Sequence, residues 1–464
     1  MTLTDTLRVL LLLALAGALL GVLRLYQLHG KPPPTPELVR KLFHIGGGII
    51  GLSLPWLFDS LVPVLVLAAT ITASFGTMRF LRRLRSGLGQ VLLGVDRRTA
   101  GEFFYLASIV LLFWLSQGDK LLYSVPLLIL ALADAFAALI GQEYGKLPLH
   151  MWKERKSYEG AVAFMLTAYF CVHVPVLLWG NTGRLESLII AFDVSVMVMM
   201  AEVAAWRGLD NIIVPLWGYM LLKSLLRMDA IELASHLAFL LALALFMRFW
   251  RNRTTLGDDA LFGATLFGYV VWAVGGWRWV VPPLIQLMIY ATITVKNPLD
   301  PLRMFRFPIV LANIAGSMFW LLAYRQSEEL ALLLPFAACF GSNVAIIALV
   351  RHKVVAPELH WRQAVSANVA KGMLVIVPSV LVLDRFTLSA LLDIAFGLIA
   401  VYAATAIFHR LQPGLSGFPV DAGRWTRQAL VVSATSVVAL GLHPGATPDV
   451  ASFSVVDLLN LLEP

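Results

Sequence analysis

The feature that most constrains this chain is a succession of apolar segments, each about long enough to cross a lipid bilayer. A membrane-spanning helix needs about 20 consecutive apolar residues. Hydrophobic residues make up 59% of the 464 residues and charged residues only 14%, a balance outside the range of soluble globular proteins. The chain is therefore predicted to be an all-α, polytopic integral membrane protein. About sixteen transmembrane helices are expected, at residues 7–28, 42–58, 61–80, 103–116, 121–141, 159–179, 186–206, 211–226, 231–250, 256–274, 278–295, 307–324, 329–350, 364–383, 387–408 and 427–442.

The cations of the connecting segments predict the orientation of these helices. Most Lys and Arg residues fall in alternate connections, which the positive-inside rule places in the cytoplasm, with both termini outside. We expect an integral protein of the cell (inner) membrane with its active site facing the cytoplasm. Because the net charge of +8 arises from short loops, no nucleic-acid partner is expected. The cationic connections are 31–41, 79–98, 146–156, 207, 248–253, 296–306, 351–362 and 410–427.

The distribution of carboxylates divides the chain in two. Up to about residue 230, the cationic connections also carry carboxylates, whereas after Asp259 acidic residues are sparse near that membrane face. We therefore predict a boundary near 228–256. A first membrane domain would comprise residues 1–228, and a second would comprise residues 256–464.

The stretch from 131 to 163 carries the strongest indication of chemistry. Asp134 lies inside an apolar run, where a carboxylate is costly unless it has a partner. Asp134, Ala138, Gly141 and Gly145 recur at spacings of four, three and four, which places them on one face of a helix. Such a small-residue face allows close approach either of another helix, as a packing seam, or of a nucleotide.

A cationic loop follows this face. It contains Lys146 and Lys156 and leads to Ser157, Glu159 and Gly160 at the start of the next apolar run. A packing seam alone does not account for a cation and a carboxylate that meet at a helix start. The loop is a candidate cradle for phosphate, and a divalent metal would link it chemically to Asp134.

Two further clusters are expected on the same side of the membrane. Arg40, Lys41 and His44 lie within about one helical turn, and their alternative explanation is a basic flank that reaches the membrane surface. The loop from 79 to 98 is better explained by contact with anionic lipids, although Arg97 and Arg98 could also help to bind phosphate.

A last cluster spans residues 201–215. Glu202 lies within a span and needs a partner, whereas Asp210 and Asn211 could serve only to cap the next helix. Together, the clusters place four carboxylates near His44 and two lysines at one membrane face. That combination is typical of magnesium-assisted chemistry on a nucleotide phosphate.

The four clusters, in this order, resemble the dolichol kinase/phytol kinase family of polytopic lipid kinases. The resemblance covers about the first 225 residues and implies phosphate transfer from a nucleoside triphosphate, typically CTP, to a membrane-embedded alcohol such as phytol, a polyprenol, dolichol or diacylglycerol. Mg²⁺ is the expected cofactor. The matching stretches are RKLFH (40–44), RTAGEFFY (98–105), LADAFAALIGQEYGK (132–146), KSYEGAVA (156–163) and AEVAAWRGLDNIIVP (201–215).

The clusters and the resemblance together define the predicted site by role. The catalytic residues would be Asp134, Glu159 and Glu202, and the metal ligands would be Asp134, Glu202 and Asp210. The nucleotide would be bound by Arg40, Lys41, His44, Gly141, Gly145, Lys146, Lys156, Gly160, Asp210 and Asn211.

Two alternatives to a kinase stay open. The related phosphatidate cytidylyltransferases share the same layout of Asp, Gly, Lys and Glu residues, so an enzyme of that kind is the second possibility. A transporter is the third, although transporters place polar groups near the membrane midplane rather than at helix ends.

The second half faintly resembles phytyl-phosphate kinase-like proteins in residues 275–284 and 306–322. Gly341 and Ser342 stand where that family carries acidic residues. The second domain is therefore expected to be non-catalytic, as a partner or a lipid-binding unit.

Overall fold

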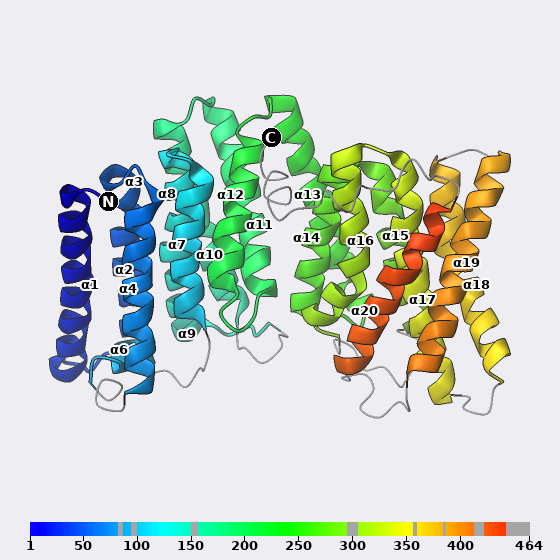
Figure 1. Ribbon diagram of the computed structural model, residues 1–464, viewed down its shortest axis with the longest axis horizontal. Coiled ribbons are helices and arrows are strands. Elements are labelled where there is room, and N and C mark those ends of the chain that lie inside the picture. The colour runs from blue at the N-terminus through cyan, green and yellow to red at the C-terminus, as the bar shows by residue number, and fades with distance from the viewer. Residues whose placement is uncertain are drawn as a thin grey trace. The chain divides into compact units, whose positions relative to one another are not determined.

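The computed structural model describes residues 1–81, 87–93, 100–149, 156–294, 305–355, 360–383, 387–412 and 422–441. These residues form helices and short connections (Figure 1), with two isolated β-bridges, Pro148 with Ser157 and Leu256 with Phe305, in place of any sheet. The predicted all-α fold is confirmed. Four cations of the predicted loops lie outside the described residues: Arg97 and Arg98 of the connection 79–98, and Lys153 and Arg155 of the connection 146–156.

Ten helical spans among the described residues are long and apolar enough to cross a membrane, as expected for a polytopic membrane protein. They are built from α1 (Leu3–His29), α4 (Leu61–Phe80), α8 (Lys120–Leu128) continued by α9 (Asp134–Tyr144), α10 (Tyr158–Trp179), α11 (Arg184–Ala204), α13 (Ala230–Trp250), α16 (Phe307–Ser327), α17 (Leu333–Val355), α18 (Trp361–Leu383) and α19 (Leu388–Leu411).

The predicted count of about sixteen spans is not confirmed. The other six predicted runs coincide with helices that fall short of the required length or mean hydropathy. These are α2 (Pro36–Leu52) followed by α3 (Leu54–Leu57), α7 (Gly101–Ser116), α12 (Asp210–Leu225), α14 (Asp258–Gly275), α15 (Trp277–Thr294) and α20 (Ala422–Ser436). The membrane that holds the protein and the cytoplasmic orientation of the site stay predictions.

The chain forms two compact units, Met1–Ala238 and Phe239–Pro464, which divide within α13. Each unit has an apolar core of its own. In unit 1, buried residues such as Leu112, Tyr123 and Leu127 belong to one cluster. The functional roles predicted for domains 1–228 and 256–464 stay predictions.

In unit 1, a π-helix sets the position of Asp134. The rod from Lys120 to Tyr144 begins as α8, passes through the π-helical turn Ile129–Ala133 and continues as α9 from Asp134. The Asp119 side chain caps the rod by accepting hydrogen bonds from the amides of Leu121 and Leu122, at 2.9 and 3.0 Å. π-Helical turns are rare, and they occur frequently at functional sites because the extra residue changes the direction of the side chains that follow.

Glycines bring α9 and α10 into close contact. A Cβ placed on Gly160 would lie 2.9 Å from the Ala137 carbonyl oxygen and 3.3 Å from the Gly141 Cα. Ser157 caps α10 by accepting a hydrogen bond from the Gly160 amide, at 3.1 Å. Only glycine allows the two backbones to approach so closely.

A tight reversal brings the end of α11 beside the start of α12. Arg207 and Gly208 both adopt left-handed backbone conformations, with φ of 56° and 84°. This turn separates Glu202, in the last turn of α11, from Asp210, the first residue of α12. The two carboxylates, eight positions apart in the sequence, therefore return to the same end of unit 1.

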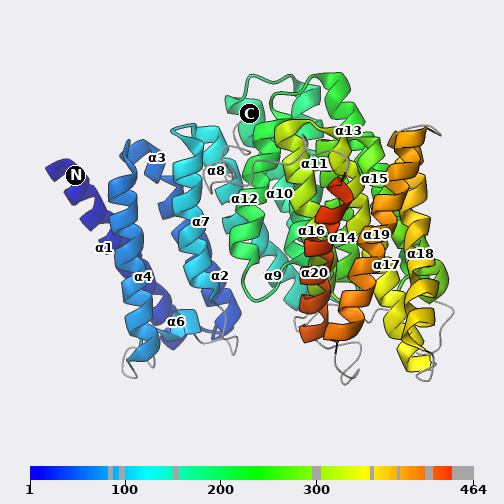
Figure 2. The ribbon, with the colours of Figure 1, turned by 45° about the vertical axis from the view of Figure 1, so that its right-hand side comes forward.

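Unit 2 is built around α17. The whole apolar window of its span is buried, and Figures 1 and 2 show α16, α17, α19 and α20 running alongside one another. Three amide side chains join these helices in the interior. Gln428 Nε2 of α20 lies 2.8 Å from Asn343 Oδ1 of α17 and 3.2 Å from Asn313 Oδ1 of α16.

Candidate active site

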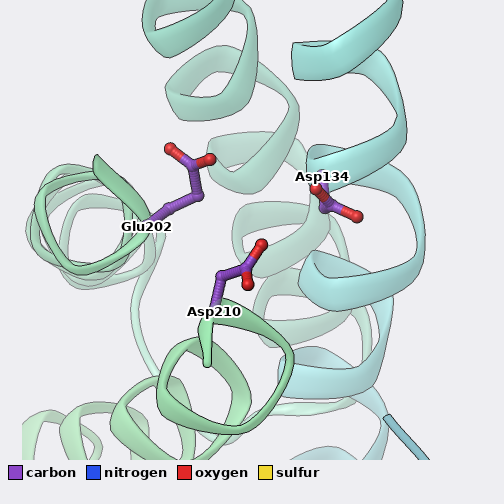
Figure 3. A group of neighbouring side chains, drawn as sticks. All are labelled: Asp134, Glu202 and Asp210. Carbon is purple, nitrogen blue, oxygen red and sulfur yellow. The ribbon is translucent and has the colours of Figure 1, made fainter. Parts of the chain in front are cut away.

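Three carboxylates from three helices meet in unit 1. Asp134, Glu202 and Asp210 each offer a carboxylate oxygen, and these oxygens all lie within 4.8 Å of one another. Figure 3 shows the side chains projecting from separate helices into a shared space. This is the one such group among the residues that the structure describes, and it comprises the three residues predicted as metal ligands.

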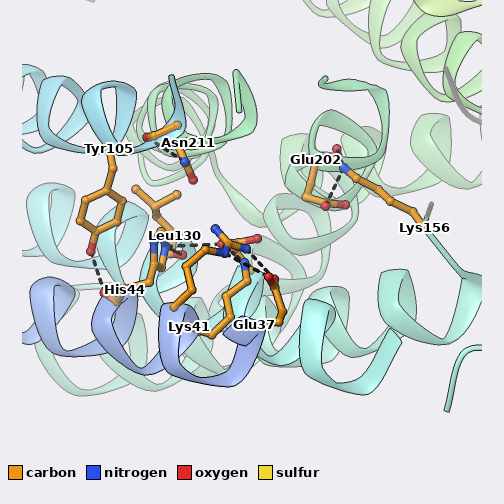
Figure 4. Close-up of polar contacts among 11 residues, drawn as sticks. Glu37, Lys41, His44, Tyr105, Leu130, Lys156, Glu202 and Asn211 are labelled. Atoms are coloured by element: carbon orange, nitrogen blue, oxygen red, sulfur yellow. Dashed lines mark hydrogen bonds and ion pairs between the residues drawn. The ribbon is translucent and has the colours of Figure 1, made fainter. Parts of the chain in front are cut away.

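A buried lysine supports Asp134. Lys41 Nζ of α2 lies 2.6 Å from Asp134 Oδ2, and the Lys41 residue is only 2% exposed. His44 Nε2, one turn further along α2, lies 3.4 Å from the same oxygen (Figure 4). The i, i+3 spacing of Lys41 and His44 places both on one face of α2, and in the structure that face meets α9.

His44 also contacts the π-helical turn. Its Nε2 lies 2.9 Å from the Leu130 carbonyl oxygen, and because a carbonyl can only accept, Nε2 carries the proton in this contact. The Tyr105 hydroxyl of α7 donates to the His44 carbonyl oxygen at 3.1 Å, and the two rings lie 4.3 Å apart between centroids. These contacts fix α2, α7 and the turn before Asp134 against one another.

A second lysine supports Glu202. Lys156 Nζ lies 2.7 Å from Glu202 Oε1 and also donates to the Glu202 carbonyl oxygen. Figure 4 shows this pair on the other side of the site from Lys41 and His44. Because both partners are largely buried, the ion pair is only weakly screened by solvent.

These groups line a cavity of about 890 Å³. That volume lies in the range of cavities that bind small molecules, roughly 300–1,000 Å³. All the predicted site residues except Glu159 are among its lining residues, namely Arg40, Lys41, His44, Asp134, Gly141, Gly145, Lys146, Lys156, Gly160, Glu202, Asp210 and Asn211.

Several of these residues have a structural contact that the sequence did not reveal. The Glu159 carboxylate accepts hydrogen bonds from the backbone amides of Lys146 and Leu147, both at 3.1 Å, and so tethers the loop to the start of α10. The Asn211 amide donates to the Gly101 carbonyl oxygen at 2.9 Å. For Gly141 and Gly160, the observed contact is the packing seam between α9 and α10.

The cavity also has lining residues that were not predicted as site residues. They include Glu37, Phe43, Phe75, Glu102, Tyr105 and Gln142. Glu37 forms an ion pair with Arg40, at 2.5 Å between Oε1 and the guanidinium, and the i, i+3 spacing of the two residues was a visible signal. Glu102 and Tyr105 lie in RTAGEFFY, one of the stretches that resemble the kinase family, but no site role was predicted for either residue.

The donor set fits a hard divalent cation. Mg²⁺ prefers oxygen ligands and is usually held by one or two carboxylates together with substrate phosphates. Asp134, Glu202 and Asp210 supply such oxygens from rigid helices. Three carboxylates this close repel one another, and Lys41 and Lys156 offset part of that repulsion.

Comparison with known proteins places this chain in a family. The chain is 31% identical over 184 residues to the phytol kinase of Synechocystis sp. (strain ATCC 27184 / PCC 6803 / Kazusa), a match that covers 39% of this chain and 76% of the relative. No family model matches the chain, and no solved structure matches it either. By its similarity to a relative of which it covers about three quarters, the chain belongs to the phytol kinase/dolichol kinase-like family.

Proposed function

We propose that unit 1 transfers the γ-phosphate of a nucleoside triphosphate, with CTP as the expected donor, to the hydroxyl of a lipid or isoprenoid alcohol. The observation that carries the proposal is the group of three carboxylates within 4.8 Å, held in a cavity beside the buried Lys41 and the largely buried Lys156. The relative's name supplies the acceptor class, because phytol is an isoprenoid alcohol.

The carboxylates and the lysines have different roles in binding the phosphates. Asp134, Glu202 and Asp210 would hold Mg²⁺, which neutralises charge on the phosphates when bound. Lys41 and Lys156 bind phosphate oxygens as point charges from two sides of the carboxylates. Phosphoryl transfer depends on positioning and charge neutralisation more than on a special nucleophile, so this composition suits the reaction.

The surrounding contacts keep these groups in place. His44 and Tyr105 tie α2 and α7 to the π-helical turn that precedes Asp134. Glu159 holds the loop that carries Lys146 and Lys156 by accepting from its backbone amides. Glu159 therefore acts on the position of the cationic loop rather than on the phosphate itself.

One assay with two labels tests the proposal. The purified protein is incubated with Mg²⁺ and with CTP or ATP labelled at the α- or the γ-phosphate, in the presence of phytol, a polyprenol, diacylglycerol or phosphatidate. Label from the γ-position in the lipid product is the expected result. Label from the α-position would instead identify a cytidylyltransferase, and a folded protein that labels none of the lipids would contradict both enzymes and favour a transporter.

Matched substitutions make the assay specific for the site. Asp134→Asn removes one charge from the carboxylate group, whereas Asp59→Asn makes the same chemical change at an exposed position outside the cavity lining. We expect transfer to be lost in the first variant and kept in the second. Equal activity of the two variants would remove Asp134 from the site.

A further inference from the structure

The cavity has an aromatic part that the phosphate-binding groups do not use. Phe43 of α2, Phe75 of α4 and Tyr105 of α7 line it, and the rings of Phe43 and Phe75 meet edge to face, 6.1 Å apart between centroids. Aromatic side chains present apolar area to a hydrocarbon chain. This is the part of the cavity suited to the end of the lipid alcohol that carries the hydroxyl.

Glu102 lies on the same helix as Tyr105. It belongs to the first turn of α7, is half-buried and lines the cavity. The start of α7 is fixed in place because the Asn211 amide donates to the Gly101 carbonyl oxygen at 2.9 Å. The Glu102 side chain therefore extends from a backbone that is anchored to α12, the helix that carries Asp210.

The other four carboxylates of the cavity lining are already engaged. Glu37 is paired with Arg40, Asp134 with Lys41, and Glu202 with Lys156. Asp210 belongs to the group of three carboxylates that would hold the metal, which is called the metal-type group below. No hydrogen bond or ion pair joins the Glu102 side chain to another residue that the structure describes. A carboxylate paired with a cation or a metal is a weaker base than one without such a partner.

We propose that Glu102 is the general base of the reaction, a proposal that rests on the proposed kinase function. The alcohol hydroxyl transfers its proton to the Glu102 carboxylate while its oxygen forms a bond to the γ-phosphorus. The bond between that phosphorus and the β,γ-bridging oxygen breaks, and the nucleoside diphosphate leaves with the electron pair. The products are a lipid monophosphate and a nucleoside diphosphate, and the proton then passes from Glu102 to water.

This assignment gives each carboxylate a distinct task. Protein kinases likewise use one carboxylate to accept the proton of the substrate hydroxyl and others to hold Mg²⁺. His44 is less suited to be the base because its Nε2 proton is donated to the Leu130 carbonyl, 2.9 Å away. Glu102 combines a carboxylate, a place beside the aromatic residues and an anchored helix start.

The test is the steady-state kinetics of Glu102→Gln in the full-length protein, with phytol, CTP and Mg²⁺. Glutamine keeps the size of the side chain but cannot accept the proton. We expect kcat to fall about 100-fold or more, with the apparent KM for CTP changed by less than about threefold. Glu143→Gln is the control, because Glu143 is exposed on α9 and is not among the cavity lining residues.

The pH profile separates a base from a residue that only supports the structure. In the wild type, kcat should fall at low pH as the base becomes protonated. The rates are measured at saturating Mg²⁺, which keeps protons off the three carboxylates that would hold the metal, and in Glu102→Gln the acid limb should then disappear from the residual activity. A residual activity that keeps the wild-type acid limb would overturn the assignment.

The outcomes distinguish this proposal from the function on which it rests. If the wild type transfers γ-phosphate and folded Glu102→Gln matches its kcat, the base is wrong and the kinase stands. If the wild type transfers none, the kinase itself is wrong. If Glu102→Gln fails to fold, Glu102→Asp takes its place, because aspartate keeps the carboxylate but withdraws it by about one bond length. A reduced kcat with the acid limb retained would support Glu102 as the base. An unchanged kcat would overturn that assignment.

Discussion

The two units differ in how their buried carboxylates are arranged. Unit 1 gathers Asp134, Glu202 and Asp210 within 4.8 Å and surrounds them with a cavity. In unit 2, Asp258 forms a two-point ion pair with Arg251, at 2.9 and 3.2 Å. Its neighbour Asp259 accepts a hydrogen bond from the Phe307 amide at 3.3 Å. These two carboxylates of unit 2 hold backbone and side chains together, whereas those of unit 1 face one another.

The interior of unit 2 also carries a network of neutral amides. Asn343 Nδ2 donates to the Asn313 carbonyl oxygen at 2.8 Å, and Gln428 bridges both asparagine side chains. Amides satisfy one another without net charge, so such a network fixes helix packing at low electrostatic cost. Like charges held close together repel, and in unit 1 Lys41 and Lys156 offset part of that repulsion.

The largest expected effect comes from removing one charge in each unit. Asp134→Asn should lower kcat on the order of a thousand-fold, since a catalytic metal contributes several kcal/mol and each 1.36 kcal/mol is tenfold. Asp258→Asn should instead lower stability by roughly 1–3 kcal/mol, with normal kcat per folded molecule, because it weakens the ion pair with Arg251. Kinetics and thermal unfolding in detergent measure both, and the reverse pattern would place the chemistry in unit 2.

Much of this site could be predicted because membrane-embedded charges need partners. That rule singled out Asp134 and Glu202, whose carboxylates lie close together in the structure, and the i, i+3 spacing of Lys41 and His44 agrees with their shared contact with Asp134. The π-helical turn before Asp134 could not be predicted, since an extra residue in a helix leaves the apolar pattern of that segment unchanged.

Other features depend on contacts between distant residues. Glu159 was predicted to be a catalytic residue, and in the structure its carboxylate accepts hydrogen bonds from the backbone amides of Lys146 and Leu147. The residue type alone does not distinguish a catalytic carboxylate from one that holds a loop in place. The predicted number of spans is not confirmed, because runs such as 103–116 contain enough apolar residues for a buried helix as well as for a span. Their helices, such as α7, are shorter than a membrane-spanning helix requires.

A smaller effect is expected at the lysines. Lys156→Ala should raise the apparent KM for CTP about tenfold, as expected for the loss of one charge-assisted phosphate contact, and should change the KM for the alcohol less. Lys371→Ala in unit 2, where Lys371 Nζ bonds to Asn368 Oδ1 at 3.2 Å, should change neither constant. Initial rates over both substrate concentrations decide the matter, and a change confined to the alcohol would contradict phosphate binding by Lys156.

Glycines at close helix contacts offer a finer comparison. A Cβ on Gly160 would lie 2.9 Å from the Ala137 carbonyl oxygen, and a Cβ on Gly372 would lie 2.8 Å from Val401 Cγ1 in unit 2. Both Gly→Ala variants should lose about 1–3 kcal/mol of stability through overpacking. Only Gly160→Ala should also lower kcat, by a few-fold, because it displaces α9 and with it Asp134. An equal loss of kcat in Gly372→Ala would indicate that unit 2 contributes to the site.

The smallest effect on the chemistry is expected from removing unit 2 altogether. A fragment that ends at Arg253 keeps α13 whole and keeps every predicted site residue, since these lie before Pro215. Its kcat should stay within about threefold of the full-length value, because the metal-type group and both lysine pairs lie inside unit 1.

A monodisperse peak in detergent must first show that the fragment is folded, because exposed small-residue faces could destabilise it without any effect on chemistry. A folded but inactive fragment that regains activity when residues 254–464 are added as a separate chain would show that unit 2 completes the site. The contrast between the two units would then describe two parts of one active site rather than a catalytic and a non-catalytic unit.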